Sequence, residues 1–185
     1  MIRSLIFAVA LAMPCVAQPA SIDLSQSTVT VHVYKSGLFA ALAHNHTIKA
    51  PIASGSVDRE RRIVSITFHA NDLRVADAEG SESDHRQIED TMKGPEVLDA
   101  AQFPVISFQS KQVETAKGES YEVAGDLKLH GRNKEITLPV AFSGGIYRGS
   151  VRLKQSDFGI TPVTIAGGAV RVKDEIEIDF EIKIH

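Results

Sequence analysis

The last part of the chain alternates strictly between apolar and charged residues, which is the period of a β-strand with one buried face. We predict that the apolar positions face the interior: Ile176, Ile178, Phe180 and Ile182. We predict that the intervening acids face solvent: Glu177, Asp179 and Glu181. A register slip of one residue would bury that row of carboxylates at a high cost in free energy.

The same alternation recurs in four earlier segments, which we interpret as antiparallel strands: residues 28–34, 63–70, 121–129 and 135–142. Turn-forming sequences separate them, such as Gly-Arg-Asn at 131–133. About seven or eight strands at this spacing are typical of an all-β barrel or sandwich.

One segment, 81–99, breaks the strand pattern. It opens with Ser and Asp residues that can cap a helix, and Ile88 and Met92 form a thin apolar edge. Gly94 and Pro95 end that helix and can start a second short turn. We therefore expect a short helical insert near residues 83–99. Two roles stay open: a lid or plug at a barrel mouth, and a surface crossover.

Residues 1–17 have the features of a secretory signal peptide: a basic residue, a short apolar run and then small residues. We expect cleavage after Ala17, because Pro14 should block the processing that would attach a lipid to Cys15. The mature domain, 18–185, would then lie in the periplasm or be secreted. It has no cysteine, and no segment approaches the roughly 20 apolar residues of a transmembrane helix.

The charge of the mature domain argues against nucleic-acid binding. Of the 20 basic residues, Arg3 belongs to the leader, which leaves 19 against 23 acidic residues and a net charge of −4. Nucleic-acid binding normally uses a basic face. The sequence also has no Gly-x-Ser-x-Gly elbow, no His-Glu-x-x-His motif and no phosphate-binding glycine loop. We therefore predict a binding protein, not an enzyme.

Three motifs follow one another in the second half of the chain. They are Phe-Pro with Ile-Ser-Phe at 103–108, Gly-Asp-Leu with a later glycine at 125–131, and Asp-Phe-Gly-Ile at 157–160. From about Ile22 onward the chain resembles the YceI-like family, also described as polyisoprenoid-binding or lipocalin-like. The resemblance implies an extended eight-stranded antiparallel barrel in the periplasm. It also implies an apolar channel for an isoprenoid, such as a quinone or polyprenyl lipid, or another amphiphilic lipid.

The apolar strand positions are candidates to line such a channel. An eight-stranded barrel holds either packed side chains or one small ligand, and small residues at Ala70, Gly125 and Gly149 are expected to leave room. The residues alone favour a packed core, whereas the resemblance favours a channel for a hydrophobic or amphiphilic molecule. The candidate channel residues are Val31, Val33, Phe39, Phe68, Phe108, Leu127, Phe142, Ile160, Ile178 and Phe180.

His44 and His46 would share one face of an extended strand. This short motif leaves three interpretations open: a structural corner, hydrogen bonds to a lipid head group at the barrel mouth, and a metal site. The last corresponds to an alternative function, a periplasmic metal- or redox-linked accessory protein. A metal would need a third ligand, and the candidates are expected to face solvent: His32, His69 and His130.

Two positions depart from the usual family pattern. The resemblance is to a subgroup with a His-Asn-His motif, in which Ala43 replaces a glycine, and Gln155 stands where many members have arginine. Both positions bear on how a head group would be held. A homodimer is one assembly that the sequence leaves open.

Overall fold

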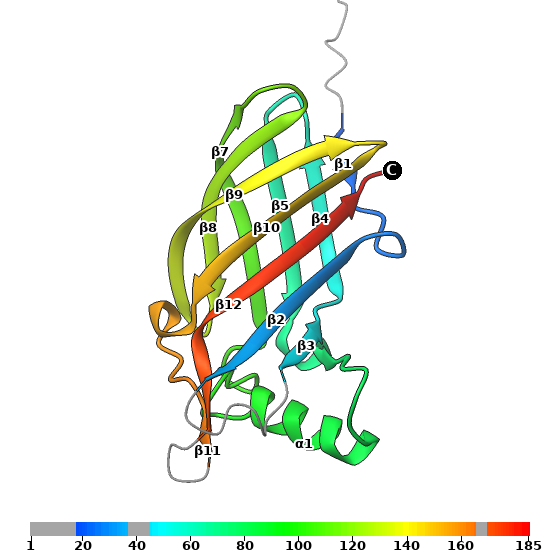
Figure 1. Ribbon diagram of the computed structural model, residues 1–185. Helices are drawn as coiled ribbons and strands as arrows, with labels where there is room; N and C mark the ends of the chain where they lie inside the picture. Colours follow the sequence, from blue (N-terminus) through cyan, green and yellow to red (C-terminus); the bar gives the residue numbers. More distant parts are fainter. Residues whose placement is uncertain (1–17, 37–44, 166–169) are drawn as a thin grey trace, which may run out of the picture.

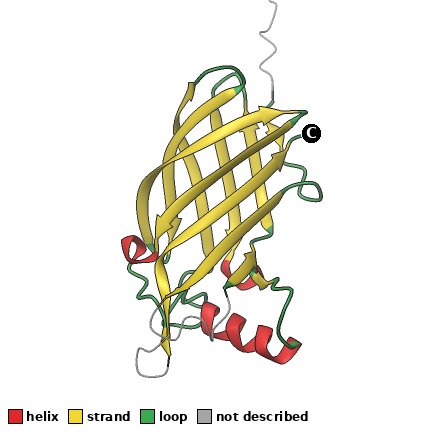
Figure 2. Ribbon diagram, in the orientation of Figure 1, coloured by secondary structure: helices red, strands yellow, loops and turns green. Residues whose placement is uncertain are grey.

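The computed structural model describes residues 18–36, 45–165 and 170–185. Its strands form one antiparallel sheet that curls into a half-barrel (Figure 1). The helical segments gather at one end of this sheet (Figure 2). The predicted signal peptide, Phe39 and His44 lie outside the described residues.

Eight strands of at least seven residues carry the described sheet: β2 (Thr28–Ser36), β4 (Ile52–Asp58), β5 (Ile63–His69), β7 (Val105–Thr115), β8 (Ser120–Leu129), β9 (Arg132–Ser143), β10 (Ile146–Lys154) and β12 (Val170–Lys183). Four shorter strands pair with them or extend the edges: β1 (Ala20–Ser21), β3 (His46–Lys49), β6 (Arg74–Val75) and β11 (Thr164–Ile165). The predicted all-β antiparallel fold with one short helix is confirmed.

The sheet is wider than a simple eight-stranded barrel because short strands are added to it. Eleven strands follow one another in the order β1-β4-β5-β7-β8-β9-β10-β12-β2-β3-β6, and β11 pairs with β12 beside this path. The chain just after β1 also reaches the other side of the sheet. There Ile22 forms an antiparallel bridge with Ile184, and Asp23 N donates to Lys183 O at 2.8 Å. This seam joins β4 to β12 and holds the sheet in its curl.

Strand β12 has the predicted orientation. Its apolar residues face the inside of the curl: Ile176, Ile178, Phe180 and Ile182. The acids lie on the outer face, where Asp179 pairs with His32 at 3.0 Å and Glu181 pairs with Arg148 at 2.9 Å. Asp179 and Glu181 are half exposed, at 53% and 52%. Carboxylates on this face therefore stay hydrated, as the alternation predicts.

Two strand glycines do not leave the free space expected of them. A Cβ atom on Gly125 would lie 2.7 Å from Cζ of Phe108, and one on Gly149 would lie 3.0 Å from Cε1 of Phe180. Each glycine sits on the strand beside an inward-facing phenylalanine ring, which occupies the space a side chain would fill. The expectation that these positions widen the interior is therefore wrong, because the glycines accommodate packed rings.

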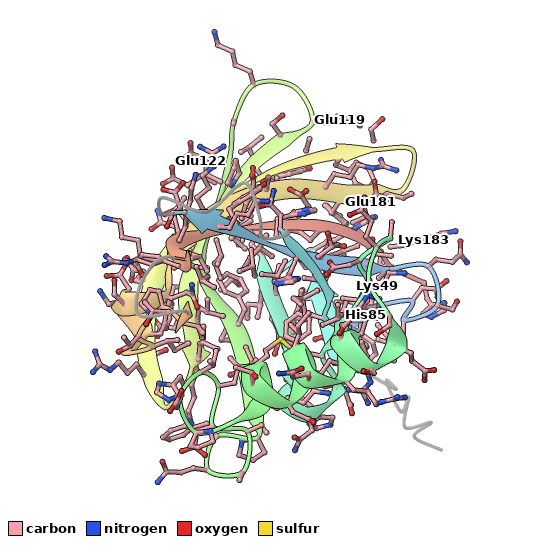
Figure 3. All side chains as sticks on the ribbon, turned by 60° about the horizontal axis from the view of Figure 1, so that its bottom comes forward. Lys49, His85, Glu119, Glu122, Glu181 and Lys183 are labelled. Carbon is pink, nitrogen blue, oxygen red and sulfur yellow. The ribbon has the colours of Figure 1, made fainter. Side chains whose placement is uncertain are left out.

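Helix α1 (Glu82–Lys93) lies across one end of the curled sheet (Figure 1). Figure 3 looks toward this end and shows the helix, with His85 on it, in front of the strands. Ser81 and Asp84 form a capping box, in which Asp84 N donates to Ser81 Oγ at 3.2 Å. As predicted, Gly94 ends the helix and a short turn follows it at residues 95–98. No described helix is long and apolar enough to cross a membrane.

Candidate ligand-binding channel

A cavity of about 940 Å³ occupies the inside of the curled sheet. Its lining is mostly apolar and comes from all eight long strands and from α1. The predicted channel residues within the described part of the chain all line it: Val31, Val33, Phe68, Phe108, Leu127, Phe142, Ile160, Ile178 and Phe180. Small-molecule sites commonly measure roughly 300–1,000 Å³, so this cavity is large enough for a sizeable ligand.

The cavity is long as well as large. Val172 lies at the α1 end of β12 and Ile182 near its other end, and both line the same cavity. At about 3.3 Å per residue, the strand between them covers roughly 30 Å. The middle of this path is lined by aliphatic and aromatic side chains from neighbouring strands, among them Val31, Leu127 and Ile178. The apolar lining therefore continues along most of the length of β12.

The α1 end of the channel contains a histidine held by a carboxylate. His46 pairs across the sheet with Val33, so both side chains are on the inner face. His46 Nδ1 lies 2.7 Å from Oδ2 of Asp77, and Thr47 N donates to Asp77 Oδ1 at 2.6 Å. The Asp77 side chain is only 10% exposed. This arrangement orients the imidazole and leaves Nε2 as the ring nitrogen that can meet a ligand.

The other histidines considered as metal ligands have different neighbours. His32 pairs with Asp179 on the outer face, His130 Nδ1 lies 3.1 Å from the carbonyl of Phe158, and His69 is exposed. Among the residues that the structure describes, no group of three or more His, Cys, Asp or Glu side chains could hold a metal ion.

Helix α1 contributes to the channel and is fastened beside it. Ile88 and Met92 form the apolar part of its contribution to the lining, and Leu98 from the turn after the helix adds to it. Glu89 links the helix to β6, accepting from Val75 N and from Lys93 Nζ, both at 2.9 Å. Burial would raise the pKa of Glu89, but these hydrogen bonds together with nearby positive charge outweigh it and hold the pKa below its usual range. The carboxylate is therefore ionised at neutral pH and secures the helix.

The opposite end of the channel lies near the turn between β4 and β5 and has a different character. The rings of Phe142 and Tyr147 lie with centroids 4.6 Å apart and line the cavity. Cζ of Arg59 lies 5.6 Å and 5.9 Å from these two ring centroids, and its Nε donates to Tyr147 Oη at 3.1 Å. Arg62 also lines this end. We call this region the arginine end.

Gln155, at the position singled out by its departure from the family pattern, lies at the α1 end of the channel. Its side-chain amide donates to the carbonyl of Lys173 at 2.9 Å. Gln155 begins a 3₁₀ turn, η3 (Gln155–Phe158), whose Phe158 is only 1% exposed. The glutamine therefore joins this turn to β12 and lies beside the cavity.

A model of the YceI-like domain matches residues 20–184, almost the whole described chain. The chain belongs to the YceI-like family. The match begins at β1 and ends at Ile184, which bridges to Ile22. It therefore covers every strand that lines the channel.

Relatives of the YceI-like chain include UPF0312 proteins of two bacterial genera. One from Vibrio cholerae is 26% identical over 113 residues, which are 56% of this chain and 58% of the relative. One from Yersinia pestis is 31% identical over 99 residues, which are 47% of this chain and 50% of the relative. The chain thus aligns with about half the length of these curated relatives.

Solved structures share the YceI-like fold at low sequence identity. Burkholderia cenocepacia BcnA has a TM-score of 0.65 at 20% identity, with 87% of this chain and 98% of that chain covered. The Campylobacter jejuni YCEI protein has a TM-score of 0.52 at 14% identity, with 99% of this chain and 93% of that chain covered. These likenesses establish the curled antiparallel fold.

Proposed function

We propose that this YceI-like protein binds and carries an isoprenoid or similar amphiphilic lipid in its apolar channel, after export to the periplasm or the cell exterior. The observation that carries this proposal is a cavity of about 940 Å³ that is lined by apolar side chains along its length and by polar groups at its two ends. Such a distribution matches a molecule with a long hydrocarbon chain and a polar head.

The energetics of burial support a hydrocarbon ligand. Each methylene group moved from water into the channel contributes about 0.8 kcal/mol, so a long chain binds without any charged contact. An apolar cavity of this size is costly to leave empty, since its lining loses van der Waals contacts. The curled sheet therefore gains stability when a chain fills it.

The polar groups at the α1 end support a role for His46 in holding a head group, together with His44. The Nε2 atom of His46 can accept a hydrogen bond from a hydroxyl group or, when protonated, donate one to a carbonyl or phosphate oxygen. A quinone or a polyprenyl lipid has such oxygens. The same residues carry the proposed assignment to a His-Asn-His subgroup.

Gentle purification followed by native mass spectrometry tests the proposal. The expected result is a bound lipid, which is identified after solvent extraction. If the leader has been removed, the protein should have the mass of a chain whose first residue is Gln18. A ligand-free protein that fails to take up added ubiquinone or a polyprenyl phosphate would contradict lipid carriage. A metal adduct that disappears in a variant lacking His44 and His46 would favour the metal- or redox-linked role instead.

A further inference from the structure

Charged groups line both ends of the channel. At the α1 end these are Lys154 and Asp84, and hydrogen bonds from Ser81 hold the pKa of Asp84 below its usual range. The arginine end has the guanidinium groups of Arg59 and Arg62 together with the carboxylates of Asp58 and Glu119. The two guanidinium groups distinguish this end, because guanidinium groups bind oxyanions with several hydrogen bonds at once.

The two guanidinium groups at the arginine end are not neutralised by partners in the described part of the chain. Arg59 has one hydrogen bond there, to Tyr147, and Arg62 has one, to the carbonyl of Val113 at 3.3 Å. Asp58, which lines the same end, accepts from Arg61 N at 2.8 Å and pairs with the Arg61 side chain at 3.8 Å. Each guanidinium has five N–H donors, so most of their donors are left for an anion.

The aromatic rings at this end fix where those donors lie. Phe142 and Tyr147 are part of the channel wall, and the Arg59 guanidinium lies over both rings. Cation–π contact and the hydrogen bond to Tyr147 hold the charge at the end of the apolar path while leaving it exposed to solvent. An acid placed there keeps its hydration and its hydrocarbon chain enters the channel.

We propose that the arginine end is a subsite for the carboxylate head group of a single-chain amphiphile, whose tail then runs toward α1. The inference rests on the proposed lipid-binding function and adds an orientation to it. A neutral head group should bind this end less strongly, because guanidinium groups form their strongest hydrogen bonds with oxyanions.

A matched pair of probes tests this subsite: cis-parinaric acid and its methyl ester, which share the fluorescent chain and differ only in head-group charge. In the double variant Arg59→Gln with Arg62→Gln, we expect the affinity for the acid to fall by about tenfold or more and that for the ester to stay within about twofold. A higher salt concentration should weaken binding of the acid to the parent protein but not to the double variant. Two variants serve as controls: Arg148→Gln removes a guanidinium from the outer face, and Glu119→Gln removes a carboxylate from the arginine end.

The outcomes separate the two proposals. The Arg148→Gln protein should bind both probes with the affinity of the parent protein. The Glu119→Gln protein should bind the acid more tightly and the ester as before. If neither probe binds the parent, the lipid-binding function fails and the subsite fails with it. If both bind but the arginine variants weaken them equally or leave the acid unchanged, lipid binding stands and the anionic subsite is overturned. Arginine-dependent binding of inorganic phosphate, without a preference for the acid over the ester, would identify a free-anion site and also overturn it.

Discussion

At the scale of single residues, the contact between His46 and Asp77 determines which imidazole nitrogen faces a ligand. The Nδ1 atom is occupied by the carboxylate at 2.7 Å, so Nε2 is the atom that would meet the proposed head group. Replacing both His44 and His46 by alanine should weaken binding of a quinone by about 1 to 3 kcal/mol, the usual loss when polar contacts go unpaired. A plain hydrocarbon of similar length should bind unchanged. Isothermal titration of both ligands provides the measurement.

The control for this experiment is His32→Ala, which removes a histidine from the outer face and should affect neither ligand. If the double variant weakens both ligands and lowers the melting temperature without ligand, the histidines form a structural corner. An unchanged preference for the polar-headed ligand would rule out the head-group role.

Gly125 gives a second prediction at the residue scale. Its added Cβ would lie 2.7 Å from both Phe108 Cζ and Ser110 Cα, so Gly125→Ala should destabilise the protein by about 1 to 3 kcal/mol through overpacking. Chemical denaturation measures this change. Phe108→Leu in the same chain should restore only the part of the loss caused by the ring, because the new methyl group also meets backbone atoms of Gln109 and Ser110. Strictly additive losses in the double variant would show that Phe108 is not the cause.

Individual contacts of this kind are hard to predict from the sequence. The alternation places His46 on a strand face, but Asp77 lies 31 residues later in an irregular segment. No periodicity connects the two positions, and only the pairing of β3 with β2 and β6 brings them together. The arginine end was missed for the same reason, since Arg59 meets Tyr147 across 88 residues.

At the scale of elements, Glu89 fastens α1 to β6 beside the channel. Its pKa lies below the ordinary value, so the ionised carboxylate contributes stability that is present above the unfolded-state pKa of about 4.3 and is lost as pH falls through the lower folded-state pKa. Acidification should therefore release the helix and speed ligand escape. Stopped-flow dissociation of a fluorescent lipid between pH 7 and pH 3 measures this.

The matching variant is Glu89→Gln, which keeps the shape but lacks the charge. It should show faster dissociation already at pH 7, corresponding to about 1 kcal/mol, and a weaker dependence on pH. Glu82→Gln serves as the control, because Glu82 is 86% exposed and pairs with Arg86 within the helix. Equal pH dependence in the parent and in Glu89→Gln would show that another group controls release.

Elements with a strong period could be predicted, and those without one could not. Strand β12 alternates without interruption, and its orientation is confirmed. Strand β4 contains Ser54, Gly55 and Ser56, which have little strand preference, and its place depends on pairing with β1 and β5. Strand β7 changes register between Ser110 and Gln112, which interrupts its period. Tertiary pairing, not local sequence, defines such strands.

At the scale of the whole molecule, a channel and a packed core predict different effects on folding when a charged residue replaces an inward-facing phenylalanine. Phe68 and Phe142 line the cavity and are only partly buried, so Phe68→Asp or Phe142→Asp should abolish lipid co-purification while soluble, folded protein remains. Phe108 is 5% exposed, and Phe108→Asp should also impair folding. Lipid extraction and circular dichroism provide the two readouts. Equal loss of soluble protein in all three, with no lipid in the parent, would favour a packed core.

The sequence predicts the class of this architecture better than its shape. Alternating strands without helical partners indicate a barrel or sandwich, and the family motifs favour the barrel. The width of the sheet depends on the short strands β1, β3 and β6, each of four residues or fewer, whose patterns are too brief to recognise. The seam between Ile22 and Ile184 is a contact between opposite ends of the described chain and has no local signal.

That seam sets an order of events in folding. The hairpins β7–β8, β8–β9 and β9–β10 join neighbours in sequence and can form early. The pairing of β2 with β12 and the bridge of Ile22 with Ile184 join segments more than 130 residues apart, so they form only after β12 has been made. Such distant pairings are typical of domains that fold in milliseconds to seconds. Until β12 is available, the described strands can form only an open sheet, without a closed channel.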